Sequence, residues 1–171
     1  RRRGEIPQDT DPGFVTKRLV TNRARRTDRT TRLSAEPLTS GVPMSISHIP
    51  APPGIKAPPL SFAARTGDLL FISGIPGFDA SGTLPEDFEA QFANVVANFT
   101  GVLDQAGATM RHLVKVNVLL TRAADVATMN RLYAESFGPA PYPARTTCVV
   151  HALPDPKMLI EIEGIASVAD R

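Results

Sequence analysis

The sequence predicts an α+β fold in one domain, and three observations lead to that prediction. Two stretches have the apolar spacing of amphipathic helices, and about five have the short apolar or alternating pattern of strands. These elements do not alternate strictly, which favours segregated layers over a doubly wound sheet. The 171 residues, 42% of them hydrophobic, are enough for one core of ordinary size.

Composition divides the chain into four parts. Residues 1–43 hold ten Lys or Arg and five Asp or Glu, a net charge of +5, and show no apolar period. We expect a disordered basic tail there, because so few apolar residues cannot offset the ordering entropy, and we interpret it as upstream or non-native sequence. Residues 44–59 read as a proline-rich extended lead, residues 60–168 as the folded domain and residues 169–171 as a C-terminal tail.

The domain begins with a predicted hairpin. Two short apolar runs, 61–64 and 69–73, are separated by a turn that contains Gly67 and Asp68, a pattern typical of paired strands. Residues 74–82 are rich in Gly, Pro, Asp and Ser and therefore predict a loop.

Two helices are predicted after this loop. Residues 86–106 and 123–137 each carry apolar side chains at spacings of three and four, and Gly107 and Gly138 follow them as stop signals. The inward positions are Phe88, Phe92, Val95, Phe99, Val102 and Ala106 in the first helix, and Val126, Met129, Tyr133 and Phe137 in the second.

Three further strands are predicted, over residues 114–120, 145–152 and 158–168. The first alternates so that Val114 and the residues at every second position after it form an apolar face. Two helices can cover only one face of a sheet of about five strands. We therefore expect self-association to cover the other face.

Composition also excludes several classes of protein. No apolar run reaches the roughly 18 residues of a membrane span, so we expect no membrane partner. One cysteine rules out an intrachain disulfide, the histidines are scattered, and we expect no metal site and a reduced, cytoplasmic setting. Residues 44–171 carry nine basic and twelve acidic residues, a net of −3, which argues against a nucleic-acid partner.

Strand parity selects the candidate site residues. Arg145 and Thr147 share one strand face, and Glu161 shares a face with Glu163 opposite two isoleucines. We expect Arg145 to lie with Glu161 on the sheet face away from the helices. A guanidinium there could bind a substrate carboxylate, and a carboxylate could orient water. The open alternative is that Arg145 only pairs with Glu161 or Glu163 across an interface.

Motifs in several segments together resemble one family. The segments are Pro143-Ala144-Arg145, Leu153-Pro154, residues 160–166, Phe71-Ile72-Ser73-Gly74, the Gln91-containing helix that ends in residues 106–108, Val114-Lys115 and residues 125–137. In order and spacing they resemble the RidA (YjgF-like) reactive-intermediate deaminases, over about residues 58–168.

This resemblance implies a chorismate-mutase-like α+β fold, a homotrimer with ligand sites between subunits, and no cofactor. It implies hydrolysis of small carboxylate-bearing enamines or imines to keto acids and ammonia. Carried onto this chain, it makes Arg145 the clamp for the substrate carboxylate and Glu161 the residue that orients water. Ser73, Gly74 and the backbone at Thr147 would line the pocket.

Leu60 would also take a substrate-binding position, and there the chain departs from the family pattern, because the deaminases usually carry a Tyr that faces the ligand. We therefore expect a larger or less polar substrate, or weak catalysis. The alternatives are a trimeric small-molecule-binding or regulatory protein with little turnover, and an aminomuconate-type deaminase. We expect Asn130 to be buried and to support nearby loop backbone, Cys148 to be a small core residue, and His151 to lie at the surface.

Overall fold

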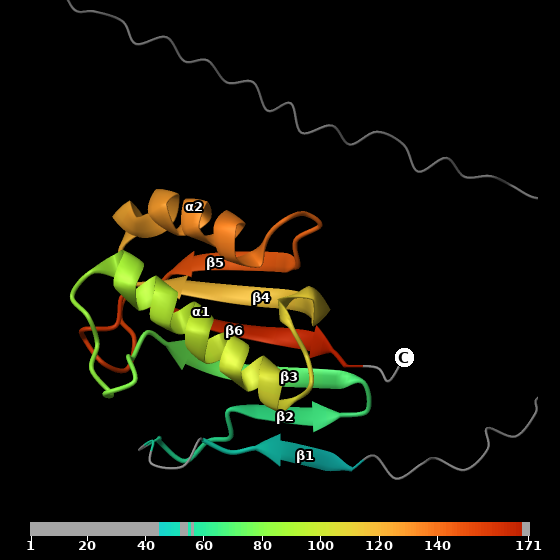
Figure 1. The fold of residues 1–171 in the computed structure, drawn as a ribbon. Helices are drawn as coiled ribbons and strands as arrows, with labels where there is room; N and C mark the ends of the chain where they lie inside the picture. Colours follow the sequence, from blue (N-terminus) through green and yellow to red (C-terminus); the bar gives the residue numbers. More distant parts are fainter. Residues whose placement is uncertain (1–44, 52–54, 56, 169–171) are drawn as a thin grey trace, which may run out of the picture. The chain divides into compact units, whose positions relative to one another are not determined.

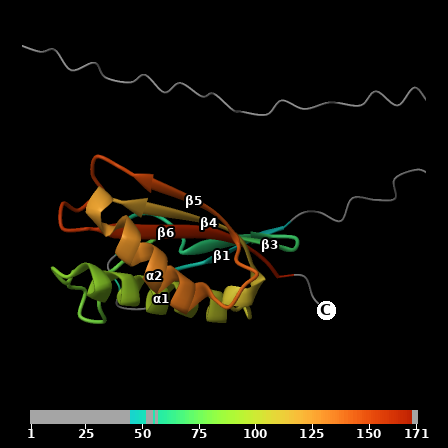
Figure 2. The same cartoon turned by 90° about the horizontal axis from the view of Figure 1, so that it is seen from above.

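A six-stranded sheet with two α-helices on one face forms the described part of the chain (Figures 1 and 2). This computed structural model describes residues 45–51, 55 and 57–168. The basic tail expected over residues 1–43 and the C-terminal tail 169–171 lie outside the described residues. The arrangement confirms the predicted α+β class with both helices on one face of a mixed sheet.

The strand order in the sheet is β1-β2-β3-β6-β4-β5 (Figure 1). Neighbouring strands are antiparallel except for β4 and β5, which are parallel. Gly67, with a φ of +53°, forms the turn of the predicted β2–β3 hairpin, a conformation that glycine adopts without strain. The strands are β1 Ile46–Ile49, β2 Ala63–Thr66, β3 Leu69–Pro76, β4 Leu113–Leu120, β5 Ala144–Val149 and β6 Ile160–Ser167.

Strand β1 lies inside the segment that the sequence assigns to the proline-rich lead. It pairs with β2 from Ile46 opposite Thr66 to Ile49 opposite Ala63, so the sheet begins upstream of the expected start at residue 60. Three of its four residues are exposed. A short edge strand with no buried face carries no apolar pattern, which is why periodicity did not reveal it.

The two α-helices are α1, Phe88–Gln105, and α2, Val126–Phe137, and both agree with the predicted helices to within three residues at each end. Asp87 caps α1 by accepting a hydrogen bond from the Ala90 amide at 2.9 Å, and Gly107 follows the helix with a φ of +68°. Short 3-10 turns, Met110–His112 and Ala123–Asp125, precede β4 and α2.

The hydrophobic core lies between the helices and the sheet. From β4 it receives Val116, Val118 and Leu120, which are fully buried as the alternation predicts. Val114 is the exception, at 51% exposed, because the β4–β6 register shifts between Leu113 and Lys115. The bulge turns Val114 away from the core and buries Leu113 instead.

No helix of the described residues lies on the second sheet face (Figure 2). This surface, called the open face below, carries the residues that alternate with the core positions. Leu69 and Phe71 are 42% and 43% exposed there, beside polar side chains of β4 and β6. The open face is thus amphipathic rather than uniformly polar.

Candidate functional site

Arg145 lies on edge strand β5, on the sheet face that the helices cover. It pairs with Val116, a fully buried core residue, so its side chain leaves the sheet toward α2. Nη2 donates a hydrogen bond to the Asn130 side-chain oxygen at 2.6 Å, and the guanidinium carbon stands 4.5 Å from the centroid of the Tyr133 ring. Arg145 itself remains exposed, so its remaining donors can reach a ligand at this edge.

Tyr133 is the platform beneath this guanidinium, and it is 4% exposed. Its ring stacks on Phe137 with centroids 4.1 Å apart. Burial raises the pKa of Tyr133 to about 12, although the Arg145 charge acts in the opposite direction. The phenol therefore stays neutral at physiological pH and holds Arg145 through its ring face.

Asn130 corrects a prediction. The sequence placed it on the buried stripe of the second helix as a support for loop backbone, but in the structure it is exposed. Its side-chain oxygen accepts from Arg145 instead. Position 130 directly follows the fully buried Met129, and one step along a helix rotates a side chain by about 100°, toward the rim of the interface with β5.

Glu161 lies on the open face, on β6, where it is partly buried beside the neighbouring strand β3. Its carboxylate packs so closely on Gly74 that a Cβ added to this glycine would overlap its Oε1 atom. Burial raises the pKa of the Glu161 carboxyl, and the nearby Glu163 charge raises it further. A carboxylate with a raised pKa is a better proton acceptor than an ordinary surface glutamate.

The structure corrects the expectation that Arg145 and Glu161 share one face. Arg145 pairs with Val116, and Glu161 pairs with Leu119, so the two lie on opposite faces of the sheet and three positions apart along β4. Parity within each strand cannot show which face of an edge strand turns inward. Within one protomer, these two residues do not form one pocket.

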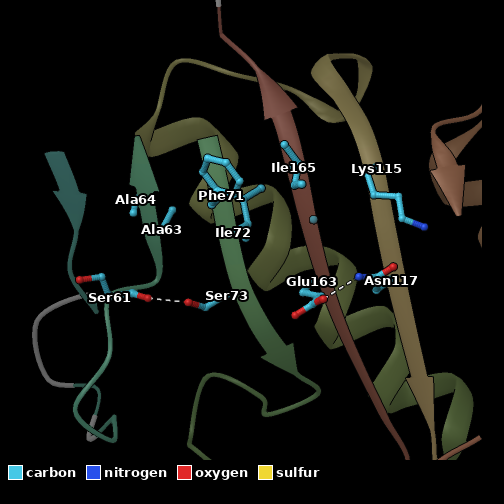
Figure 3. Close-up of a pocket in the computed structure, with 11 residues that line it drawn as sticks. Ser61, Ala63, Ala64, Phe71, Ile72, Ser73, Lys115, Asn117, Glu163 and Ile165 are labelled. Atoms are coloured by element: carbon cyan, nitrogen blue, oxygen red, sulfur yellow. Dashed lines mark hydrogen bonds between the residues drawn. The ribbon is translucent and has the colours of Figure 1, made fainter. Parts of the chain in front are cut away.

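The open face contains a cavity of about 320 Å³ over β2, β3, β4 and β6 (Figure 3). Ser73, one of the predicted site residues, lines it and donates a hydrogen bond to the Ser61 carbonyl at 2.7 Å. Opposite it, Asn117 donates to Glu163 at 2.6 Å, and Lys115 reaches Thr146. The cavity is therefore polar along one wall and bordered by the exposed ring of Phe71 on another.

The remaining predicted residues fall in different places. Thr147 shares the helix-covered face with Arg145, and its buried hydroxyl has no hydrogen-bond partner. Leu60 is 44% exposed and does not line the cavity. Cys148, expected in the core, is exposed on the open face, because β5 turns Thr147 inward. His151 is exposed, as expected.

Sequence reasoning did not assign functions to two groups that the structure brings to these sites. The apolar spacing predicts Tyr133 as an inward residue of α2, but its stacking on Arg145 depends on the α2–β5 packing. Asn117 and Glu163 meet because β4 and β6 are neighbours, which alternation alone does not reveal.

Among the residues that the structure describes, no three His, Cys, Asp or Glu side chains cluster in a way that could hold a metal ion. Likewise, no helix in this part of the chain is long and apolar enough to cross a membrane.

The sequence is similar to proteins that carry related names. A RutC family protein of Pyrococcus abyssi is 38% identical over 117 residues, 65% of this chain and 91% of that protein. "Reactive Intermediate Deaminase A, chloroplastic" of Arabidopsis thaliana is 39% identical over 119 residues, 66% of this chain and 63% of that protein. A Schizosaccharomyces pombe relative is named as mitochondrial, so relatives do not share one compartment and the cytoplasmic setting stays a prediction.

Solved structures also resemble the fold. RidA from an Antarctic Psychrobacter is 34% identical with a TM-score of 0.62, over 73% of this chain and 98% of that one. A Mycobacterium tuberculosis member of the YjgF/YER057c/UK114 family is 28% identical with a TM-score of 0.63, over 72% and 100%. The family model described as Endoribonuclease L-PSP matches residues 54–168. The chain therefore belongs to the RidA/YjgF family.

Proposed function

We propose that the protein is a cofactor-independent deaminase that hydrolyses enamine or imine acids to keto acids and ammonia. The observation that carries this proposal is that the protein offers one group suited to bind a substrate carboxylate and one suited to accept a proton from water. Arg145 offers an oriented, exposed guanidinium, and Glu161 offers a partly buried carboxylate with a raised pKa. A relative that is 39% identical is named as a reactive intermediate deaminase, which supports the same reaction.

The reaction needs few groups because an imine carbon is already electrophilic. An enamine first takes a proton on carbon and gives one up from nitrogen, which makes it the imine. Glu161 accepts a proton from water as the water oxygen bonds to the imine carbon, and returns a proton to the nitrogen as the C=N double bond opens, which gives a carbinolamine. The hydroxyl proton then passes through Glu161 to the nitrogen as the C–N bond breaks, so that keto acid and ammonia leave. Arg145 holds the substrate carboxylate throughout, and orientation supplies much of the rate gain.

We infer that the complete site combines residues of two protomers. Arg145 and Glu161 lie on opposite faces of the sheet in one protomer, so a substrate that touches both needs Arg145 from one copy and Glu161 from another. The open face supports assembly, because Phe71 and Leu69 expose apolar surface on the face that carries Glu161, and Phe71 lines the cavity together with Glu163. A homotrimer with three equivalent sites fits this requirement.

The central experiment measures ammonia release from enamines that a pyridoxal-phosphate enzyme generates in situ. Wild type is compared with Arg145→Ala and Glu161→Gln, and Arg131→Ala serves as control because Arg131 is an exposed arginine of α2 paired with Glu89. We expect the two site variants to lose on the order of 100-fold in rate and the control to match wild type. A wild type no faster than buffer on several side chains would refute the deaminase.

A mixing experiment tests whether the site is shared. Arg145→Ala and Glu161→Gln are co-expressed with different affinity tags, and mixed assemblies carrying both tags are purified. If each site of a trimer takes one residue from each of two neighbours, about a third of the sites in the purified mixed trimers regain both groups. We expect activity near that fraction of wild type. Activity no higher than the sum of the two variants alone would place the site within one protomer.

A second candidate is a ligand-binding protein with little turnover. Its support is that Arg145 is held by Asn130 and Tyr133 without any contribution from Glu161, so carboxylate binding does not require the catalytic carboxylate. Calorimetry with a keto acid distinguishes this candidate from the deaminase. Binding of the keto acid that is lost in Arg145→Ala, together with no ammonia release by wild type, would favour the ligand-binding protein. The test substrates should include larger and less polar side chains and an aminomuconate, because Leu60 replaces the usual tyrosine.

A further inference from the structure

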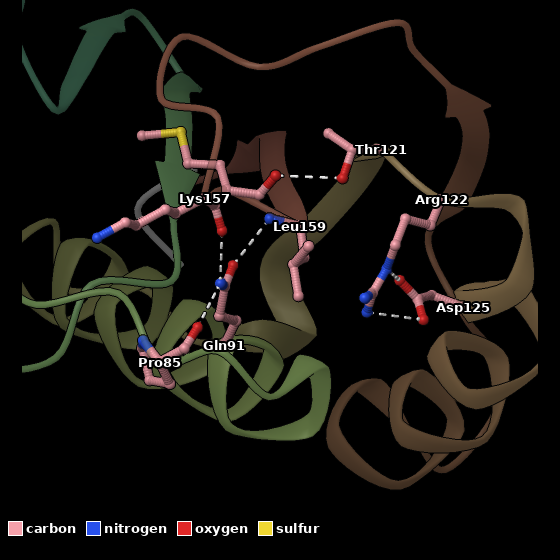
Figure 4. Close-up of polar contacts among 8 residues, drawn as sticks. Pro85, Gln91, Thr121, Arg122, Asp125, Lys157 and Leu159 are labelled. Carbon is pink, nitrogen blue, oxygen red and sulfur yellow. Dashed lines mark hydrogen bonds and ion pairs between the residues drawn. The ribbon is translucent and has the colours of Figure 1, made fainter.

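Gln91 is the one polar residue in the buried core of the described part of the chain, with no exposed surface. Its side-chain nitrogen donates to the Pro85 carbonyl at 2.6 Å and to the Lys157 carbonyl at 2.8 Å, and its oxygen accepts from the Leu159 amide at 2.9 Å (Figure 4). All three partners are backbone groups, so the contacts depend on where the chain runs rather than on the partners' side chains.

These hydrogen bonds join segments that are distant in sequence. Lys157 and Leu159 lie 66 and 68 residues beyond Gln91, in the connection that enters β6. Pro85 belongs to the loop that leads into α1. An apolar side chain at position 91 would pack in the core but would leave buried backbone groups unpaired. The amide side chain is therefore suited to holding two loops together, and filling the core would not by itself need an amide at this position.

Residue 91 also contacts the end of β3. A Cβ at Gly77 would lie 2.6 Å from the Gln91 backbone oxygen, so the chain after β3 passes directly against this turn of α1. Gly77 follows Gly74 by three residues, and Leu159 precedes Glu161 by two. One residue thus bonds the segment that enters β6 and packs against the segment that leaves β3, and these two strands bring the Glu161 carboxylate onto Gly74.

We propose that Gln91 is a positioning residue that keeps the Glu161 carboxylate packed on Gly74. Its side chain fixes the entry of β6, while its backbone packs against Gly77 at the exit of β3, where Asn94 bonds the Gly77 carbonyl at 3.2 Å. Loss of the amide releases the 157–159 segment on the side of α1, although Thr121 still bonds the carbonyls of Met158 and Leu159, each at 3.2 Å. The Glu161 carboxylate then gains solvent and loses its fixed direction. The catalytic part of this inference rests on the deaminase proposed above.

The test compares Gln91→Met, which keeps the length and removes all three hydrogen bonds, with Gln91→Glu, which keeps the acceptor for Leu159. Gln105→Met is the matched control, because Gln105 ends the same helix and bonds only the Gly101 carbonyl. The first measurement is the Glu161 titration by carboxyl ¹³C NMR, with its signal assigned through Glu161→Gln. We expect Gln91→Met to lower the Glu161 pKa, Gln91→Glu to lower it less, and the control to leave it unchanged.

The second measurement is turnover in the ammonia assay. We expect Gln91→Met to lower kcat about 10-fold with KM within about twofold of wild type, because the carboxylate is misdirected while Arg145 is untouched. A variant with a lower melting temperature but an unchanged Glu161 titration would overturn the proposal and leave Gln91 a stabilising residue only. If Gln91→Met does not fold, the Gln91→Glu titration decides. The NMR result stands even if wild type releases no ammonia, so failure of the deaminase is distinguishable.

Discussion

The Arg145 guanidinium rests on the face of the Tyr133 ring, 4.5 Å from its centroid, and this contact ties α2 to edge strand β5. Asn130, one turn earlier on α2, accepts from the same guanidinium at 2.6 Å. Two side chains of α2 thus set the direction of the Arg145 guanidinium, which contacts within the sheet would not orient. A stacked guanidinium at an exposed edge gains about 0.5–1 kcal/mol from such a ring.

Tyr133→Phe should leave the protein as stable as wild type. The Tyr133 hydroxyl is buried without a hydrogen-bond partner, so removing it eliminates an unsatisfied group while the ring stays on Arg145. We expect the free energy of unfolding in urea, at fixed protein concentration, to change by less than about 0.5 kcal/mol or to rise. Tyr133→Leu should lower it by about 1–3 kcal/mol. A loss of more than about 1 kcal/mol in Tyr133→Phe would show that the hydroxyl has a partner in the assembled protein.

Gly74→Ala should separate activity from stability. The new methyl group would overlap the Glu161 carboxylate, which is the far end of a flexible side chain and can swing away at small cost. We expect a loss of at least about 10-fold in ammonia release with little change in melting temperature. Gly101→Ala is the control: nothing lies within 4 Å of its added Cβ, and alanine inside α1 should stabilise the protein by about 0.5–1 kcal/mol without affecting activity. Full activity in Gly74→Ala would exclude a catalytic position for Glu161 beside Gly74.

Glu163→Gln should move the acid limb of the pH–rate profile to lower pH. Burial is the larger cause of the raised Glu161 pKa and the Glu163 charge is the second, so the variant removes only part of the shift. Glutamine retains the oxygen that accepts from Asn117, which keeps the local geometry. If ionised Glu161 is the base, kcat/KM should reach its plateau at lower pH than in wild type. If the acid limb stays at the same pH in Glu163→Gln, the ionisation behind that limb belongs to a group other than Glu161.

Glu161→Gln should stabilise the protein more at neutral pH than at pH 4. Because the folded-state pKa of Glu161 is raised, the folded state holds its proton at pH values where the unfolded chain has lost it. The contribution of Glu161 to stability is therefore full below its unfolded pKa and is lost as the pH rises through its folded pKa. The free energy of unfolding of both proteins, measured from pH 4 to neutral pH, should show an advantage of Glu161→Gln over wild type that grows with pH and then levels off. A difference that shrinks with pH would contradict the raised pKa.

Cys148 should report whether the open face is covered in solution. It is exposed in the protomer and pairs with Leu119 on that face. If copies assemble there, a thiol reagent should label Cys148 slowly at high protein concentration and faster on dilution. Phe71→Asp, which places a charge on the same face, should make labelling fast at every concentration. Equal rates for both proteins would argue that assembly leaves this face free.

Much of the fold could be predicted from local patterns. The helices around Phe99 and Tyr133 and the β2–β3 turn at Gly67 follow from apolar spacing and backbone freedom, which neighbouring residues determine. Two errors came from features without a local signal. Strand β1 has no buried face, and Val114 leaves the core at a bulge that depends on the pairing of β4 with β6.

The sequence by itself determined the α+β class and the helix ends, and the family resemblance singled out Arg145 and Glu161 as candidate site residues. Only the tertiary structure decided that they lie on opposite faces, and that Asn130 binds Arg145 rather than loop backbone. The physical reason is that alternation within a strand fixes which residues share a side, whereas the packing of a helix against that strand decides which side faces inward.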